Sequence, residues 1–330
     1  MSDRRLPDSE RPVPNAPRAN DAAPPTTWKR HLWRIVQVVG CAAVAWFIVR
    51  YVLRHWETLS SARPSGDWAM LGIGMGVVLV ANGLTVILFR FFMAHNGLAL
   101  TLAESWELYS LPQLGKYLPG KFASVAASSY LLKKKGLSLP HGLATATVFT
   151  AAAMLGMSLM AVLCLPAWAG QTGLGWAIAF AAAALLAVPA ACSSLWWRLL
   201  NNLLRRCGRP ELAAYPRPSA MGILILGLTL RWGIAAIGFF LAARFLEQVP
   251  WGLAPRIVAA LSVSYVAGLA AAFAPAGLGV REALLILMIQ GALGPGFSTL
   301  FAALTRLMTV AVDLTLFGVA LVIGRHWKRK

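Results

Sequence analysis

Two proline–glycine breaks interrupt the long apolar runs of this sequence, and a cation follows each break within a few residues. The breaks are Pro119-Gly120-Lys121 and the stretch from Pro275 to Arg281. Proline removes a backbone donor and glycine relaxes φ, so a helix is expected to end at each break. Inside a bilayer, the freed backbone groups must be satisfied by protein or by trapped water. The breaks therefore predict broken helices within a membrane domain. The alternative is a surface loop whose Arg281 and Glu282 lie among headgroups.

The composition is typical of a polytopic membrane protein, because hydrophobic residues make up 58% of the chain and charged residues only 13%. We expect residues 1–27, which are polar and proline-rich, to form a disordered cytoplasmic tail, and residues 28–330 to form one membrane domain. The net charge of +18 does not indicate a nucleic-acid partner, since the cations cluster at the ends of apolar runs. Anionic lipid headgroups are the more natural partners.

The apolar runs predict an all-α fold with about six full spans: Leu32–Leu53, Trp68–Phe92, His141–Leu165, Gly173–Ala191, Ala220–Leu241 and Phe297–Ile323. The loop from Trp196 to Pro218 is dense in arginine, which places it on the cytoplasmic side. Counting the spans from this loop puts both termini in the cytoplasm. We expect a multi-pass protein of a bacterial-type inner (plasma) membrane.

Two segments are too broken to be simple spans. Leu98–Leu132 begins and ends beside basic clusters, which favours a re-entrant hairpin from the cytoplasmic side, with an amphipathic surface helix as the alternative. Arg256–Leu293 is predicted to form a second re-entrant hairpin, which enters from the outer side. Each hairpin lies between two spans, so residues 68–165 and 219–324 form two halves of inverted topology. Interrupted segments at corresponding places in inverted halves indicate a central substrate site.

The candidate site follows from the polar residues at the breaks and in the last span. Half-helix N-termini and nearby cations bind anions well, so a phosphate-bearing headgroup would suit the site. Arg306 and Asp313 are seven residues apart and share a helix face, so either an internal salt bridge or a substrate role would fit. The substrate-binding candidates are Gln113, Lys116, Tyr117, Lys121, Arg281, Glu282, Arg306 and Asp313. For Asn82, in the middle of a span, a hydrogen bond between helices is the preferred interpretation.

Enzymatic motifs are not found in the sequence. There is no His-Glu-x-x-His, no phosphate-binding P-loop and no Gly-x-Ser-x-Gly, and the cysteines show no metal-ligand spacing. We therefore expect no catalytic residues, no metal and no cofactor.

Several motifs resemble a known family. Leu111 to Lys121, Tyr130 to Ser138 and Pro275 to Ala283, with Arg306 and Asp313 in the last span, resemble the transmembrane region of lysylphosphatidylglycerol synthases and its stand-alone relatives. The resemblance implies a flippase-like lipid domain. We expect no lipid synthesis, because the soluble aminoacyl-transferase domain of the full-length synthases has no counterpart in these residues. Ala276 departs from the family's motif, where a second glycine is common, and this bears on substrate identity.

The sequence thus predicts a translocator that moves an anionic or phosphate-bearing lipid between leaflets. The alternative is a non-transporting, lipid-binding membrane subunit of a lipid-modifying or glycosyltransferase system. The expected ligand is a membrane lipid with an anionic headgroup. A lipid-modifying enzyme and a second copy of the chain are the protein partners considered.

Overall fold

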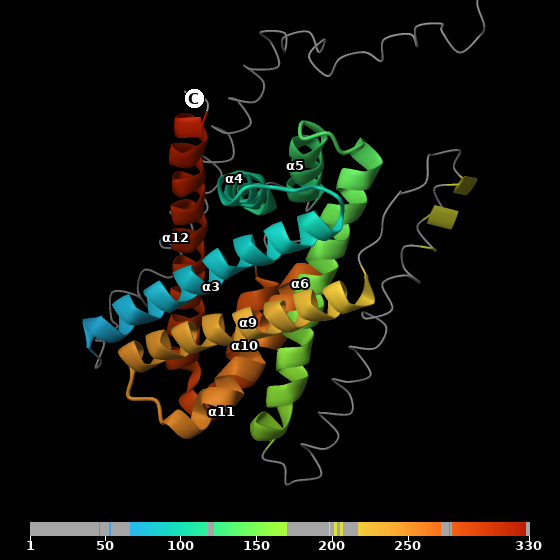
Figure 1. The fold of residues 1–330 in the computed structure, drawn as a ribbon. Coiled ribbons are helices and arrows are strands. Elements are labelled where there is room, and N and C mark those ends of the chain that lie inside the picture. The colour runs from blue at the N-terminus through green and yellow to red at the C-terminus, as the bar shows by residue number, and fades with distance from the viewer. Residues whose placement is uncertain are drawn as a thin grey trace, which may run out of the picture.

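A computed structural model of the chain describes residues 67–117, 122–169, 217–271, 277 and 279–327, with a few isolated positions elsewhere. The described residues form helices connected by short turns, and no strand occurs among them (Figure 1). The helices are α3 (Trp68–His95), α4 (Leu102–Gln113), η2 (Leu114–Tyr117), α5 (Phe122–Lys133), α6 (Leu139–Ala169), α9 (Pro218–Leu246), η3 (Trp251–Leu253), α10 (Ala254–Ala270), α11 (Val280–Leu293) and α12 (Pro295–Trp327).

The predicted class, an all-α polytopic membrane protein, is confirmed. Among the described residues, 5 helices are long and apolar enough to cross a membrane: α3, α6, α9, α12 and the segment Trp251–Ala270. The first four match predicted spans. Trp251–Ala270 was expected to be half of a re-entrant hairpin, but its 20 residues also have the length and composition of a full crossing. The tail at 1–27 and the predicted spans Leu32–Leu53 and Gly173–Ala191 lie outside the described ranges.

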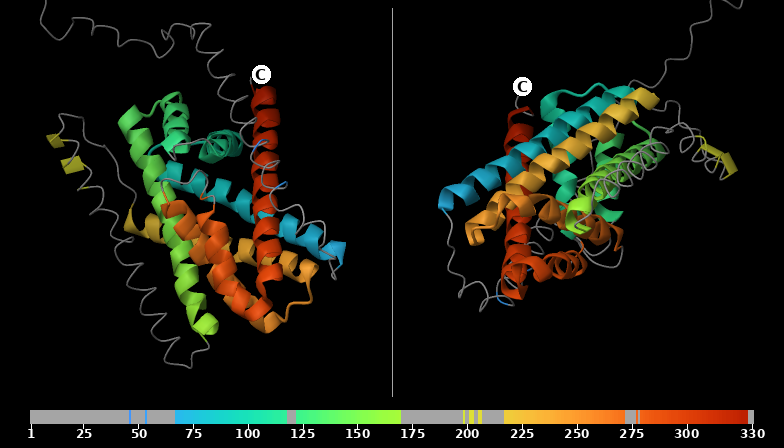
Figure 2. Two further views of the ribbon diagram at one scale, coloured as in Figure 1. Left: turned by 180° about the vertical axis from the view of Figure 1, so that it is seen from behind. Right: turned by 90° about the horizontal axis from the view of Figure 1, so that it is seen from below.

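Helices of the two predicted halves pack against one another. α3 lies beside α9, α4 packs against α12, and α10 packs against α6. Figure 1 shows α3 running in the opposite direction to α9, and the view from behind shows the same for α6 and α12 (Figure 2). Ring contact between Trp68 at the start of α3 and Phe245 near the end of α9 agrees with this antiparallel arrangement. Two halves of similar build and opposite direction would produce these pairings. Their orientation in a bilayer stays a prediction.

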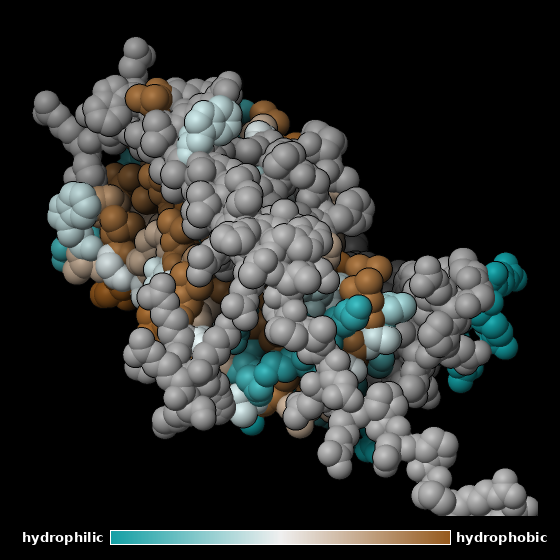
Figure 3. All heavy atoms as spheres, turned by 90° about the horizontal axis from the view of Figure 1, so that it is seen from above, coloured by the Kyte–Doolittle hydropathy of each residue, from teal (hydrophilic) through white to brown (hydrophobic). Residues whose placement is uncertain are grey.

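Apolar side chains both fill the interior and cover part of the outside. Phe239, Phe240 and Leu261 are buried in a core to which α3, α9, α10, α11 and α12 all contribute. On the outer faces of α3 and α9, large side chains such as Val80 and Leu226 are exposed. Figure 3 shows apolar residues gathered at the surface on one side of the molecule. Such exposure is expected where helices face lipid rather than water.

The first broken segment folds as a hairpin in which α4 packs against α5. Its start is closed by a capping box, in which the Thr101 side chain accepts from the Glu104 backbone and the Glu104 carboxylate accepts from the Thr101 backbone. Lys135, just beyond α5, reaches back to Glu104 with Nζ 2.5 Å from the carboxylate oxygen. The two open ends of the hairpin are therefore tied together. The predicted break Pro119-Gly120-Lys121 lies outside the described residues.

Close contact between α3 and α9 depends on glycine. A Cβ added at Gly238 would lie 2.6 Å from the Gly74 carbonyl oxygen and 2.7 Å from a Val78 methyl, whereas one at Gly222 in the same helix would meet nothing within 4 Å. We expect Gly238→Ala to lower the free energy of unfolding by about 1–3 kcal/mol through overpacking. Gly222→Ala should be neutral or slightly stabilising, since alanine favours helix more than glycine does. Thermal unfolding in detergent measures both; equal melting of the two variants would contradict the packing argument.

The Glu104–Lys135 pair predicts a pH dependence. The hydrogen bond from Lys135, followed by that from the Thr101 backbone, lowers the pKa of Glu104 from 4.5 to about 2. Because this pKa is lower in the folded state, the stabilisation is complete above pH 4.5 and is lost as the pH falls towards 2. Glu104→Gln keeps a capping residue but loses the ion pair, so it should cost about 0.5–1 kcal/mol at neutral pH. Its difference in unfolding free energy from wild type should vanish at the acid end, and Glu247→Gln, at an exposed carboxylate, is the matched control.

Candidate functional site

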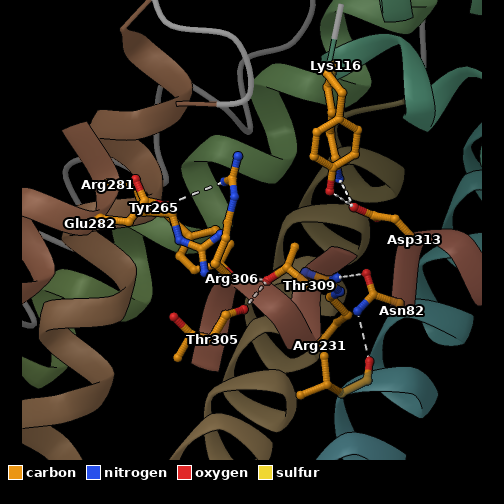
Figure 4. A network of polar contacts seen from close by, with 12 residues as sticks. Asn82, Lys116, Arg231, Tyr265, Arg281, Glu282, Thr305, Arg306, Thr309 and Asp313 are labelled. Atoms are coloured by element: carbon orange, nitrogen blue, oxygen red, sulfur yellow. Dashed lines mark hydrogen bonds and ion pairs between the residues drawn. The ribbon is translucent and has the colours of Figure 1, made fainter. Parts of the chain in front are cut away.

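Polar side chains from six elements meet in the interior of the bundle, where they are surrounded by apolar residues. We call this set the central polar cluster; Figure 4 shows most of it from close by. Its members are Asn82, Lys116, Tyr117, Arg231, Tyr265, Arg281, Glu282, Arg306, Thr309 and Asp313. Of its charged groups, Arg281, Glu282, Arg306 and Asp313 are at most 9% exposed. Charges buried to this extent are costly and usually functional in membrane proteins.

Hydrogen bonding and an ion pair to Asp313 connect the turn η2 to the last helix, α12. The Tyr117 hydroxyl donates to Asp313 Oδ2 over 2.6 Å, and Lys116 Nζ lies 2.7 Å from the same oxygen. α4 ends one residue after Pro112, and the 3₁₀ turn η2 that follows carries both Lys116 and Tyr117 towards α12. The Lys116 side chain is 31% exposed, so the cluster reaches the surface of the described structure at this point.

The start of α11 places a carboxylate and two guanidinium groups together. Gly279 precedes the helix at φ +80°, a conformation that favours glycine. Its N–H donates to Glu282 Oε2 over 2.8 Å, so Glu282 closes the N-terminus of its own helix. The other carboxylate oxygen of Glu282 lies 3.7 Å from Nη1 of Arg306 on α12. Glu282 thus balances charge and fixes where α11 begins.

Arg281 contacts neutral groups. Its guanidinium lies over the Tyr265 ring, 3.5 Å from the centroid, and Nη2 donates to the Thr309 hydroxyl over 3.4 Å. Tyr265 and Thr309 are themselves hydrogen-bonded at 2.7 Å. Glycine permits this geometry, because a Cβ at Gly277, which has φ +70°, would lie 2.7 Å from the Gly268 carbonyl oxygen. The close approach of the turn to α10 brings Arg281 onto Tyr265.

Arg231 joins the cluster from the middle of α9. Its Nη2 donates to the Asn82 side-chain oxygen, and its Nε donates to the Ala81 carbonyl over 3.2 Å. The guanidinium carbon lies 5.8 Å from the centroid of the Trp232 ring. These partners are neutral too, so Arg231 is a partly buried cation held by amide oxygens.

Six of the eight predicted site residues belong to the central polar cluster: Lys116, Tyr117, Arg281, Glu282, Arg306 and Asp313. Gln113 lies half-buried at the end of α4, and Lys121 lies outside the described residues. Arg306 and Asp313 each have a different charged partner, Glu282 and Lys116 respectively. The predicted hydrogen bond of Asn82 between helices is present: the Asn82 side chain on α3 accepts it from the charged side chain of Arg231 on α9.

Sequence reasoning did not assign Arg231, Tyr265 or Thr309 to the site. A charge in the middle of the α9 span was a usable signal for Arg231, because such charges rarely lack a role. Tyr265 and Thr309 gave no signal, since single tyrosines and threonines are ordinary in apolar helices. Over the residues that the structure describes, no group of three or more His, Cys, Asp or Glu side chains could hold a metal ion.

Comparison of the chain with protein-family models, curated proteins and solved structures found no match. The resemblance to the transmembrane region of lysylphosphatidylglycerol synthases therefore stays a prediction that rests on the motifs themselves.

The hydrogen bond from Tyr117 to Asp313 can be tested alone, because Lys116 still pairs with Asp313 when the hydroxyl is removed. We expect Tyr117→Phe to lower the free energy of unfolding by about 1.5–3 kcal/mol, as for a buried hydrogen bond to a charged group. Tyr130→Phe, at a tyrosine 42% exposed, is the control and should change melting little. Thermal unfolding in detergent gives the melting temperatures of both variants and of wild type. A Tyr117→Phe protein that melts like wild type would show that the Tyr117–Asp313 hydrogen bond adds no stability.

Proposed function

We propose that the protein is a membrane lipid translocator that moves an anionic or phosphate-bearing lipid between leaflets. The observation that carries the proposal is the central polar cluster, in which buried cations meet inside an apolar bundle. Guanidinium groups present fixed, planar donors that suit phosphate oxygens. Arg281 is in the first turn of α11, where backbone donors and the helix dipole add to its attraction for an anion.

The arrangement of the helices suits transport. Both broken segments supply residues to the cluster: Lys116 and Tyr117 from the turn after α4, and Arg281 and Glu282 from the start of α11. Sites built at broken helices between two repeated halves are a recurring design of secondary transporters. In the proposed topology the halves are inverted in a bacterial-type inner membrane, with both termini cytoplasmic. The partly exposed Lys116 marks where a headgroup would enter, while acyl chains stay against the apolar outer faces.

A reconstitution assay tests this function. Purified protein in liposomes should move a fluorescent phosphatidylglycerol between leaflets, measured by the fraction that a membrane-impermeant quencher reaches. Protein that retains lipid through purification but moves none would instead be the lipid-binding subunit of another system. Protein that neither retains nor moves an anionic lipid would contradict both functions.

Arg281→Ala is the sharpest variant for transport. Arg281 contacts the Tyr265 ring and the Thr309 hydroxyl, so its removal should leave no carboxylate stranded. We expect lipid movement to be lost while the melting temperature changes little. Arg281→Lys should retain partial activity, because the charge remains but the planar fork is gone. Arg244→Ala is the matched control: Arg244 lies on α9 against Trp251, away from the cluster, and movement should continue. A large fall in the melting temperature of Arg281→Ala would indicate a structural role instead.

A further inference from the structure

The cations of the central polar cluster outnumber its carboxylates by two. Lys116 pairs with Asp313, and Arg306 lies beside Glu282. Within the described ranges, Arg281 and Arg231 contact neutral partners only, the former at Tyr265 and Thr309 and the latter at Asn82 and the Ala81 carbonyl. The nearby Glu107 does not change this balance, because its carboxylate lies beside Gly324, three helical turns beyond Asp313.

An excess of positive charge in an apolar interior is unfavourable unless a ligand neutralises it. Rings and hydroxyls orient Arg281, but they supply no formal charge. A ligand with two negative charges would balance the cluster, whereas a phosphodiester with one would leave a cation uncompensated. A phosphomonoester carries close to two negative charges near neutral pH, and so does a diphosphate diester.

The two uncompensated guanidinium groups belong to one connected set. Arg281 lies on the face of Tyr265, whose ring is in edge contact with Trp232 at 4.5 Å between centroids, and Arg231 lies over Trp232. Thr309 bonds to Tyr265 and lies one helical turn from both Arg306 and Asp313. Figure 4 shows Arg231, Tyr265, Arg281 and Thr309, which come from four separate helices. The two guanidinium groups are therefore linked to each other through the rings of Tyr265 and Trp232.

We propose that the site selects a lipid whose headgroup is a dianion, a phosphomonoester or a diphosphate diester, over a lipid with a singly charged phosphodiester. This selectivity rests on the proposed function, since it concerns the same site. It makes Arg231 a specificity residue together with Arg281, although Arg231 is on a helix that is not broken.

Lipid competition measures the selectivity. The full-length protein is placed in phosphatidylcholine nanodiscs that contain equal amounts of phosphatidic acid, a phosphomonoester, and phosphatidylglycerol, a phosphodiester, with identical acyl chains. Native mass spectrometry then gives the ratio of the two lipids retained. We expect phosphatidic acid to be retained in roughly tenfold excess, as one additional charge interaction in a partly screened site would give. Equal retention of the two lipids would overturn the proposal.

Variants of opposite charge separate selectivity from damage to the fold. Arg231→Gln and Arg281→Gln each remove one cation, so each should move the ratio towards one. Asp313→Asn removes a negative charge and releases Lys116, so it should raise the ratio. Arg244→Gln, outside the cluster, should leave the ratio as in wild type. A general loss of packing would lower the ratio in all three cluster variants, and that common direction would count against the proposal.

Two further experiments are needed. The first identifies whether the bound phosphate belongs to a lipid or is free, and the second tests the selectivity independently of the proposed translocation. Inorganic phosphate is added to the phosphatidic acid complex; displacement at lower concentration than by a short-chain phosphatidic acid would assign the site to free phosphate and overturn the lipid selectivity. Liposomes are then used to compare movement of the two lipids. Equal movement would leave a translocator without the proposed selectivity. Selective retention of phosphatidic acid without movement would support the selectivity and contradict translocation.

Discussion

The burial of charge within an apolar bundle is the constraint on which the rest of the structure depends. Four side chains that carry full charges, Arg281, Glu282, Arg306 and Asp313, are almost inaccessible at its centre. Each must be held by partners, because isolated charges in such surroundings are very costly. The fold supplies these partners from helices far apart in the chain, as when Tyr117 donates to Asp313 over a separation of 196 residues. A polar interior of this kind restricts how the surrounding helices can be arranged.

Helix α12 organises this interior. One of its faces presents Arg306, Thr309 and Asp313 to the turn of the first hairpin and to the start of α11. Elsewhere the helices are drawn together by small residues, as expected where apolar association cannot drive helix packing in lipid. Gly74 and Gly238 bring α3 against α9, and Gly268 and Gly277 bring the turn before α11 against α10. The first contact sets the position of Arg231 relative to Asn82, and the second sets that of Arg281 relative to Tyr265.

The same features connect the architecture with lipid chemistry. The outer faces of the long helices are apolar, whereas the centre carries more cations than carboxylates among the described residues. A phospholipid has the complementary division, with apolar chains attached to an anionic headgroup. Because no relative or solved structure matches the chain, these contacts and charges are what support the proposed function.

The sequence by itself determined the class of fold and the places where helices break. The length of the apolar runs, their arginine-rich ends and the proline–glycine pairs are local properties of the sequence. They could therefore be recognised without knowing which helices pack against each other. It also identified six members of the central polar cluster, because polar and charged residues beside helix breaks and inside an apolar span are unusual. Only the tertiary structure decided the partners. Helical spacing puts Arg306 and Asp313 on one face, but whether they pair with each other or with Glu282 and Lys116 depends on which helices pack against that face. The same holds for Arg231, whose contact with Asn82 requires α3 to pack against α9.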